Sequence, residues 1–349
     1  MSSAEDFIIE PPLLNTACPW ATTFEDLLRL YISPDTGAIT TRTCMLNGFK
    51  HNDSIHQYRL FDPVTPGTLN EVGSDGDHGS SSLNTFGYSP HPLRQYLDFI
   101  HDISQYCIGE QIGGVDRIRA DKVIIVSVTG TPEEVAQCYR QIDRHRELVI
   151  LPLAVEINLS CPNIPGKPPP AYSGEELKPY LDALLLCQYD KQYEKQKHLP
   201  LGLKLPPYTY SSQFATLVDA IGSHRCHFSF LTSTNTLGNS LMIDLPTSSS
   251  ATQSNTRSRA VAKESFFGLG GLAGTAIHPL SLGNVHSLRQ LLDKNANLRG
   301  IKILGVGGVA DHEGYQRMRA AGAYAVGVAT ALGRKGLSVF GDIRNSARQ

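Results

Sequence analysis

The chain has 349 residues and a formal net charge of −2, with 18% of its residues charged. This near-neutral balance argues against a nucleic-acid partner, which usually requires a basic surface. Seven cysteines are scattered along the chain without a CxxC pair. We therefore expect neither a disulfide framework nor a metal site, and the pattern suits a reducing compartment.

The first twelve residues are acidic and contain no positively charged stretch. They resemble neither a secretory signal nor an Arg-rich transit peptide. No apolar run approaches the roughly 18 residues that a membrane span needs. We therefore expect a soluble, cytoplasmic protein without a membrane partner.

Strand-like and helix-like segments alternate along the chain, which predicts α/β structure built from parallel βαβ units. Strands are expected near residues 12–17, 37–43, 122–128, 153–159, 201–205, 228–234, 301–305 and 323–328. Helices are expected between them, for example at residues 24–31, 132–144, 175–187, 212–221, 280–294 and 311–321. Eight strands with intervening helices predict a single (β/α)₈ barrel domain, a TIM barrel, over residues 1–349. A doubly wound sheet is the alternative, but the first strand lacks the Gly-rich turn usual in that fold.

Two polar stretches interrupt this alternation. Residues 47–82 include a Gly-, Ser- and Asp-rich run, and residues 246–265 are low in apolar content. Such composition is unsuited to barrel strands, so we expect both to be loop insertions.

Chemically reactive side chains follow several of the expected strands. Asn158 and Cys161 follow the fourth strand, Lys204 ends the fifth and Asn235 ends the sixth. Taken singly, each residue has an ordinary structural interpretation: most free cysteines are buried hydrophobes, and a lone Asn is more often a turn former. Their convergence at strand ends favours a site, because the reactive face of a parallel barrel lies there.

Two further strand ends suit a phosphate group. Gly307 and Gly308 end the seventh strand, and Ala329 and Thr330 end the eighth and open a short helix. Glycine allows the backbone to approach an anion closely, and a helix start offers free N–H groups. A GxGG run alone is weak evidence, but a phosphate site after strands seven and eight is usual in these barrels.

The order of these segments resembles that of the dihydroorotate dehydrogenases, in particular the soluble class that uses fumarate. The most specific matches are residues 156–168, 202–208 and 234–244, supported by residues 268–274, 279–285 and 303–332. The resemblance implies an FMN-dependent oxidoreductase of pyrimidine biosynthesis that oxidises dihydroorotate to orotate. It also implies a homodimer.

The resemblance assigns roles to individual residues. The catalytic residues are Cys161 and Lys204. Cys161 removes the C5 proton while a hydride passes from C6 to flavin N5, chemistry that needs no metal. The expected cofactor-binding residues are Thr16, Ala17, Arg42, Thr43, Asn158, Lys204, Gly274, Gly307, Gly308, Ala329 and Thr330. The expected substrate-binding residues are Arg42, Asn84, Phe86, Gly87, Tyr88, Asn158, Asn163, Asn235 and Thr236.

Several positions depart from the family pattern. Arg42 stands where the family has a Lys, and Phe86 and Tyr88 replace an aliphatic pair beside the substrate. Other replacements near the flavin are Ala17, Cys18, Ala273 and Ala329, and we expect no closing helical stretch after Phe340. These changes leave two alternatives open: a paralogue with the same flavin chemistry on another small cyclic or unsaturated acid, and a non-catalytic barrel.

Fumarate is the expected oxidant. Its carboxylates can use the same cation and amides as orotate. A membrane-quinone enzyme of this fold would need an apolar N-terminal helical platform, which residues 1–14 do not offer. An NAD-linked enzyme would need a partner chain carrying further cofactors. We therefore expect dihydroorotate and fumarate as the small-molecule partners.

Overall fold

A computed structural model describes residues 7–64, 80–108, 118–164, 166, 168–189, 198–244, 259–260 and 268–345. Its centre is a closed barrel of eight parallel strands, with each strand hydrogen-bonded to the next barrel strand along the chain. The strands are β1 (Leu13–Asn15), β2 (Ala38–Thr40), β5 (Val123–Val128), β6 (Leu153–Asn158), β7 (Leu201–Leu205), β8 (Phe230–Ser233), β13 (Lys302–Val306) and β14 (Ala325–Val328). All eight predicted strands are confirmed, and the doubly wound alternative is wrong.

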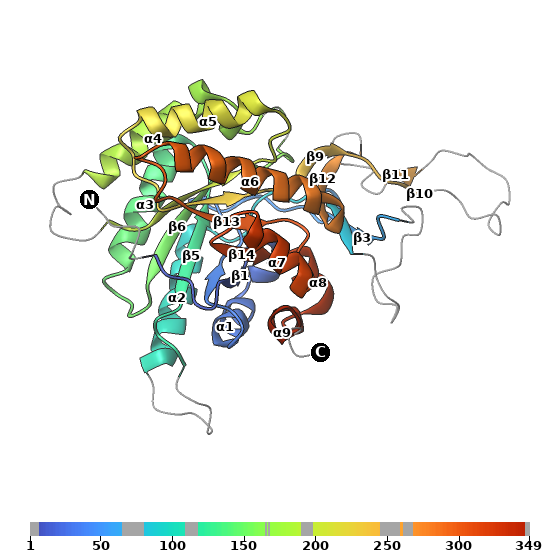
Figure 1. Cartoon of the computed structure of the whole chain (residues 1–349). Coiled ribbons are helices and arrows are strands. Elements are labelled where there is room, and N and C mark those ends of the chain that lie inside the picture. The colour runs from blue at the N-terminus through green and yellow to red at the C-terminus, as the bar shows by residue number, and fades with distance from the viewer. Residues whose placement is uncertain are drawn as a thin grey trace.

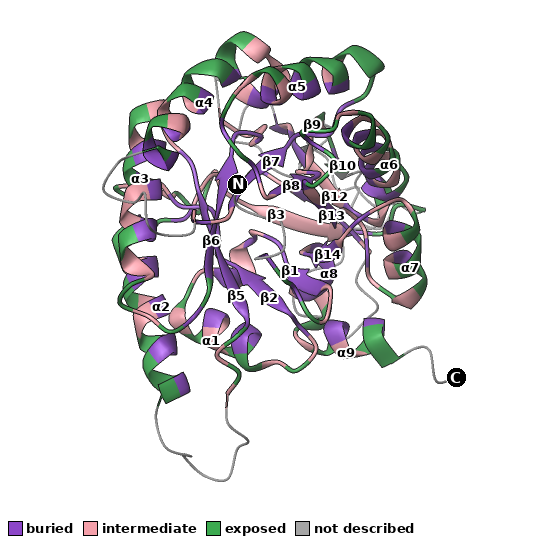
Figure 2. Cartoon of the chain, turned by 60° about the vertical axis from the view of Figure 1, so that its left-hand side comes forward, coloured by how far each residue is buried: buried purple, intermediate pink, exposed green. Residues whose placement is uncertain are grey.

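Helices surround the barrel (Figure 1). They are α1 (Phe24–Ile32), α2 (Leu93–Ile108), α3 (Pro132–His145), α4 (Gly174–Gln188), α5 (Ser211–Ser223), α6 (His278–Lys294), α7 (His312–Ala320), α8 (Thr330–Lys335) and α9 (Ser338–Asn345). Figure 2 shows buried strands inside a ring of helices whose outer faces are exposed. The last described helix, α9, buries Val339, Phe340 and Ile343.

Inward-facing side chains change from apolar to polar along the barrel strands. In β5, Val123 and Ile125 belong to an inner apolar core, whereas Ser127 further along hydrogen-bonds to Glu156 of β6. The ring of Phe7 stacks on that of Phe230 within the same core, with centroids 4.5 Å apart. The amino-terminal end of the barrel is therefore packed with hydrocarbon, and polar groups gather toward the carboxyl ends of the strands.

A second sheet lies outside the barrel. Its antiparallel strands pair in the order β3 (Tyr58–Phe61), β4 (Ser81–Asn84), β12 (Gly270–Gly274) and β9 (Leu237–Ser240). The described residues of the predicted insertion 47–82, namely 47–64 and 80–82, contribute β3 and the start of β4 to this sheet, whereas residues 65–79 lie outside the described residues. Residues 246–265 fall mostly outside the described residues, except for β11 (Arg259–Ala260), which pairs with β10 (Ile243–Asp244).

Lys122 is a buried cation at the start of β5, with only 2% of its surface exposed. Its ammonium group donates to the carbonyl oxygens of Tyr31 and Ser33, at 2.5 and 2.6 Å, and to Thr36 Oγ1 at 3.0 Å. The two carbonyls belong to the last turn of α1 and to its C-cap, where helical carbonyls lack intrahelical partners. Burial nevertheless lowers the pKa of Lys122 from 10.5 to about 7.

We expect Lys122 to make stability depend on pH. Between about pH 7 and 10.5 the unfolded chain holds this proton more tightly than the folded chain, so the stability that Lys122 contributes rises with pH. Relative to Lys122→Met, the free energy of unfolding of the wild type should therefore grow by roughly 3 kcal/mol from pH 7 to pH 10. Urea unfolding at each pH measures this difference. Lys302→Met, which removes a half-buried lysine bonded to Phe7 O, is the matched control; a wild-type advantage that shrinks with pH would contradict the expectation.

Candidate active site

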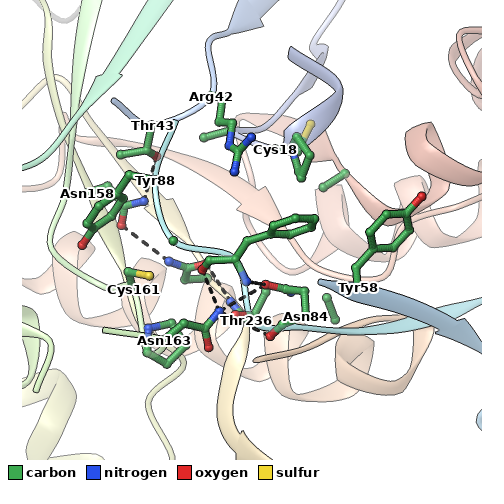
Figure 3. A pocket seen from close by; sticks show the side chains of 18 of the residues that line it. Cys18, Arg42, Thr43, Tyr58, Asn84, Tyr88, Asn158, Cys161, Asn163 and Thr236 are labelled. Carbon is green, nitrogen blue, oxygen red and sulfur yellow. Dashed lines mark hydrogen bonds between the residues drawn. The ribbon is translucent and has the colours of Figure 1, made fainter. Parts of the chain in front are cut away.

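An open cavity of about 750 Å³ lies at the carboxyl ends of the barrel strands, beside the second sheet. Figure 3 shows Arg42, Asn84, Asn158, Cys161 and Asn163 directed into this space. Its lining includes these predicted site residues: Ala17, Arg42, Thr43, Asn84, Phe86, Gly87, Tyr88, Asn158, Cys161, Asn163, Lys204, Asn235, Thr236, Ala329 and Thr330. The catalytic and substrate-binding candidates therefore face one cavity.

A second cavity of about 550 Å³ adjoins the first and contains the predicted phosphate end. It is lined by Thr16, Gly274, Gly307 and Gly308, among others. The two cavities share Ala17, Lys204, Asn235, Thr236, Ala273, Ala329 and Thr330. Every predicted site residue thus lines one cavity or the other, and the shared lining makes a continuous space for one elongated ligand.

A buried hydrogen-bond chain beneath the cavity begins at Glu156. Its carboxylate accepts from Thr232 Oγ1 at 2.6 Å and from Ser127 Oγ at 2.8 Å. Ser127 Oγ lies 2.9 Å from Thr43 Oγ1, which accepts from Asn158 Nδ2 at 2.9 Å. Because Ser127 donates its proton to Glu156, Thr43 must donate to Ser127 and can only accept from Asn158. The carboxylate therefore fixes which end of the Asn158 amide is the donor.

The other amides are held in a similar way. The Nδ2 group of Asn163 donates to Phe86 O at 2.9 Å and to Asn84 Oδ1 at 3.2 Å. Asn235 Nδ2 donates to Ser160 Oγ at 3.0 Å. The four amides come from three segments of the chain, which are the end of β4, the end of β6 with its loop, and the loop after β8. These bonds hold them in defined orientations around the cavity.

Cys161 differs from the other six cysteines, because it is half-buried while they are buried. Burial raises the pKa of the Cys161 thiol, whereas a backbone N–H at Asn163, the charge of Lys204 and the hydroxyl of Tyr88 lower it. The alternative interpretation as a buried hydrophobe therefore suits the other six better than Cys161. A thiol in a polar cavity beside a cation can serve as a base.

Two buried cations face the cavity. Lys204 is 3% exposed, and its ammonium group lies 3.5 Å from Thr16 Oγ1. Arg42 is 8% exposed and lies over the ring of Phe86, with Cζ 5.4 Å from the centroid. Its Nη2 atom is buried without a hydrogen-bond partner among the described residues. Because a buried charged donor is costly when unpaired, Arg42 is suited to an anionic ligand.

Two glycines of the second cavity lie at positions where both the backbone conformation and the available space require glycine. Gly307 and Gly308 have φ angles of 133° and 75°, which side-chain-bearing residues rarely adopt. A Cβ atom at Gly307 would collide with Ser281 Oγ, and one at Gly308 would lie 2.6 Å from His278 Cβ. Helix α8 begins beside them at Thr330. This bare backbone fits a phosphate group.

Sequence reasoning missed part of the lining. Trp20, Tyr58 and Ser82 line the first cavity without having been predicted to do so. Cys18, which the sequence analysis named only as a departure from the family pattern, also lines it, and burial raises the pKa of its thiol to about 12. The ring of Trp20 meets that of Tyr58 edge-on, with centroids 5.6 Å apart. Their aromatic character was the only signal, and aromatic residues are more often core residues.

The described part of the chain contains no cluster of three or more His, Cys, Asp or Glu residues arranged to hold a metal ion. Within the same residues, no helix is both long and apolar enough to cross a membrane.

Comparison with known proteins places this site in a family. The sequence profile of the family described as dihydroorotate dehydrogenase matches residues 75–348. A Trypanosoma cruzi protein named dihydroorotate dehydrogenase (fumarate) is 29% identical over 338 residues, covering 96% of this chain and 88% of its own. The ligand-free dihydroorotate dehydrogenase structure from Eimeria tenella superposes with a TM-score of 0.64 over 95% of this chain and 82% of its own, at 17% identity. The last similarity concerns the fold alone.

The family match, on a closed barrel of this kind, places the chain among the oxidoreductases. The chain belongs to the dihydroorotate dehydrogenase family, which confirms the resemblance expected from the sequence.

Gly307→Ala tests the glycine cradle. The added methyl group meets Ser281 and forces an unfavourable φ, so we expect a loss of about 1–3 kcal/mol in the free energy of unfolding. Gly283→Ala is the control: Gly283 lies within α6 with open space around it, and alanine there should stabilise by about 0.5–1 kcal/mol. Urea unfolding measures both changes. If Gly307→Ala had the same free energy of unfolding as the wild type, the backbone conformation at residue 307 would not require glycine.

Proposed function

We propose that this protein oxidises (S)-dihydroorotate to orotate in de novo pyrimidine biosynthesis, with FMN as cofactor and fumarate as oxidant. The observation that carries the proposal is the buried, unpaired Nη2 atom of Arg42 in the same cavity as Cys161 and the four amides. Orotate and fumarate both carry carboxylates, which pair well with a guanidinium. Amides suit the imide edge of orotate, because each amide offers both a donor and an acceptor.

The cavities fit FMN by the chemistry of their linings. Gly307, Gly308 and Thr330 would hold the phosphate, and Lys204 would lie at the ring edge with Thr16 and Ala17 nearby. The remaining proposed cofactor contacts are Arg42, Thr43, Asn158, Gly274 and Ala329. When bound, the flavin supplies a two-electron acceptor for hydride. The oligomeric state, the compartment and the single-domain organisation stay predictions.

The side chains of the cavity bind the substrate, orient its ring and remove its proton. Arg42 binds the substrate carboxylate, and the amides of Asn84, Asn158, Asn163 and Asn235 orient the ring, supported by Phe86, Gly87, Tyr88 and Thr236. Cys161 Sγ removes the C5 proton, so the C–H bond breaks as an S–H bond forms. The Lys204 cation stabilises negative charge that develops nearby.

Flavin content and oxidant preference test the proposal directly. The purified protein should bind about one FMN per chain, more weakly than its relatives because Ala273 and Ala329 replace glycines. Enzyme reduced by dihydroorotate without oxygen should be reoxidised rapidly by fumarate, with orotate competing. Protein that takes up no added FMN would overturn the proposal. Reoxidation by a short-chain quinone but not by fumarate would overturn the choice of oxidant.

Cys161→Ser should retain flavin and orotate binding but reduce flavin several orders of magnitude more slowly at neutral pH. A hydroxyl is a far poorer base than a thiol with an ordinary pKa near 8.5. Because burial raises the pKa of Cys161, the wild-type rate should rise with pH through and beyond the ordinary thiol range. Stopped-flow absorbance measures the reduction. The matched control is Cys226→Ala, at a buried thiol outside the cavity lining; an unchanged rate in Cys161→Ser would place the base elsewhere.

Arg42→Lys distinguishes dihydroorotate from another small acid as substrate. If Arg42 pairs with the carboxylate, lysine preserves the charge, and turnover of dihydroorotate should be preserved or improved. Arg42→Met removes the charge and should weaken orotate binding roughly 100-fold, as expected when a charged hydrogen bond is lost. Flavin absorbance titrated with orotate measures the affinity. Poor orotate binding in the wild type and in both variants would favour a paralogue that acts on another small acid. That acid would have to fit a cavity in which Arg42 lies over the ring of Phe86.

A further inference from the structure

A histidine outside the cavities bonds to the glycine turn that is proposed above to hold the phosphate. His278 begins α6 and is 9% exposed. Its Nδ1 atom lies 2.7 Å from the carbonyl oxygen of Gly307. Its side chain also packs behind the next residue, because a Cβ atom added at Gly308 would lie 2.6 Å from His278 Cβ. Both glycines line the second cavity, whereas His278 lines neither.

The hydrogen bonds of the imidazole ring define which nitrogen carries the proton. Arg317 Nε, on α7, donates to His278 Nε2 at 3.4 Å. A guanidinium can only donate, so Nε2 accepts and the neutral ring carries its proton on Nδ1. Nδ1 therefore donates to Gly307 O. This bond holds the Gly307 carbonyl toward α6, on the side of the turn away from the cavity.

The orientation of this carbonyl sets that of the next N–H group. In a planar trans peptide, the C=O of one residue and the N–H of the next point in opposite directions. With Gly307 O held at His278, the N–H of Gly308 is directed away from α6 and toward the second cavity. It donates to no main-chain oxygen of the described residues. A backbone N–H in this position is a good donor to an anionic oxygen.

Resting on the function proposed above, we propose that His278 is the positioning residue for the cofactor phosphate. Its Nδ1–H group holds Gly307 O and so keeps the N–H of Gly308 directed at the phosphate. Without that bond the peptide between the two glycines is free to rotate, because glycine adopts many backbone conformations. Rotation would turn a carbonyl oxygen toward the anion in place of the N–H. His278 acts through this peptide and does not touch the cofactor.

Three substitutions at this position separate the Nδ1 donor from the rest of the ring. In His278→Asn, the amide nitrogen is as many bonds from Cα as Nδ1 and can still donate to Gly307 O. In His278→Gln the amide nitrogen takes the place of Nε2, and His278→Phe keeps the ring without a donor. We expect FMN affinity to fall roughly 10- to 100-fold in the Gln and Phe variants, the size expected for a lost hydrogen bond to a charged group. The Asn variant should stay within about threefold of the wild type.

His312→Phe is the matched control. His312 begins α7, and its Nδ1 atom lies 2.8 Å from the main-chain oxygen of Ile343. Its Nε2 atom lies 3.2 Å from Gln316 Nε2, so this ring is held in the same way as that of His278. His312 lines neither cavity. The control should therefore lower the Tm, as His278→Phe does, but leave FMN affinity unchanged.

The test is a fluorescence titration of each full-length protein with flavin, after bound flavin has been removed. FMN and riboflavin are titrated separately, because riboflavin has the same ring system and no phosphate. His278→Phe should bind FMN more weakly and riboflavin as the wild type does. Circular dichroism checks that each variant is folded. A merely structural role for His278 would weaken the binding of both flavins alike.

The outcomes separate this inference from the proposed function. A loss confined to FMN in His278→Phe, restored in His278→Asn, supports the inference whichever substrate the enzyme prefers. Unchanged FMN affinity in folded His278→Phe, or an equal loss for both flavins, overturns it even if dihydroorotate is oxidised. Should His278→Phe not fold, equal FMN affinities in the Asn and Gln variants overturn it. A wild type that binds FMN but does not oxidise dihydroorotate overturns the proposed function alone.

Discussion

The buried carboxylate of Glu156 sets the polarity of the site from inside the barrel. It can only accept hydrogen bonds while ionised, so Ser127 and Thr232 must point their protons at it. That requirement passes through Thr43 to the amide of Asn158. A group that touches no ligand thus determines which atoms the cavity floor presents as donors and which as acceptors. Networks of this kind are stable only when every member is satisfied, because the low dielectric makes an unpaired group costly.

Positive charge is the second property of the cavity. Arg42 and Lys204 are both nearly excluded from water, and neither forms a carboxylate ion pair within the described part of the chain. Desolvation lowers the pKa of Arg42, which shows the cost of holding this charge without a partner. An anionic ligand would offset that cost. The positive charges that an anionic ligand would need are therefore already in place in the cavity before the ligand binds.

The sequence predicted the barrel well, because its strands are short, mostly apolar runs, and several of them end in unusual polar residues. Asn158, Lys204 and Asn235 could be placed at one face from strand order alone. The four-stranded sheet could not be found in this way. Its strands β3 and β9 are short and largely half-buried, and β4 pairs with β12, which lies about 190 residues further along the chain. The positions of Trp20 and Tyr58 in the cavity depend on that packing. Glu156 lay within the motif that identified the family, but the bonds of its carboxylate to two other strands, β5 and β8, have no signal in the sequence.

The division of the cavity between barrel and second sheet has an evolutionary consequence. The floor residues Thr43 and Asn158 belong to the hydrogen-bonded interior, where one substitution disturbs several partners. Phe86, Tyr88 and Ala273 lie on or next to the second sheet, which is built from two distant stretches of chain and shares little of that network. Mutations in this sheet can change the shape of the cavity while the catalytic residues on the barrel side are retained. Substitutions confined to the second sheet can therefore change ligand specificity while the barrel and the thiol of Cys161 are preserved.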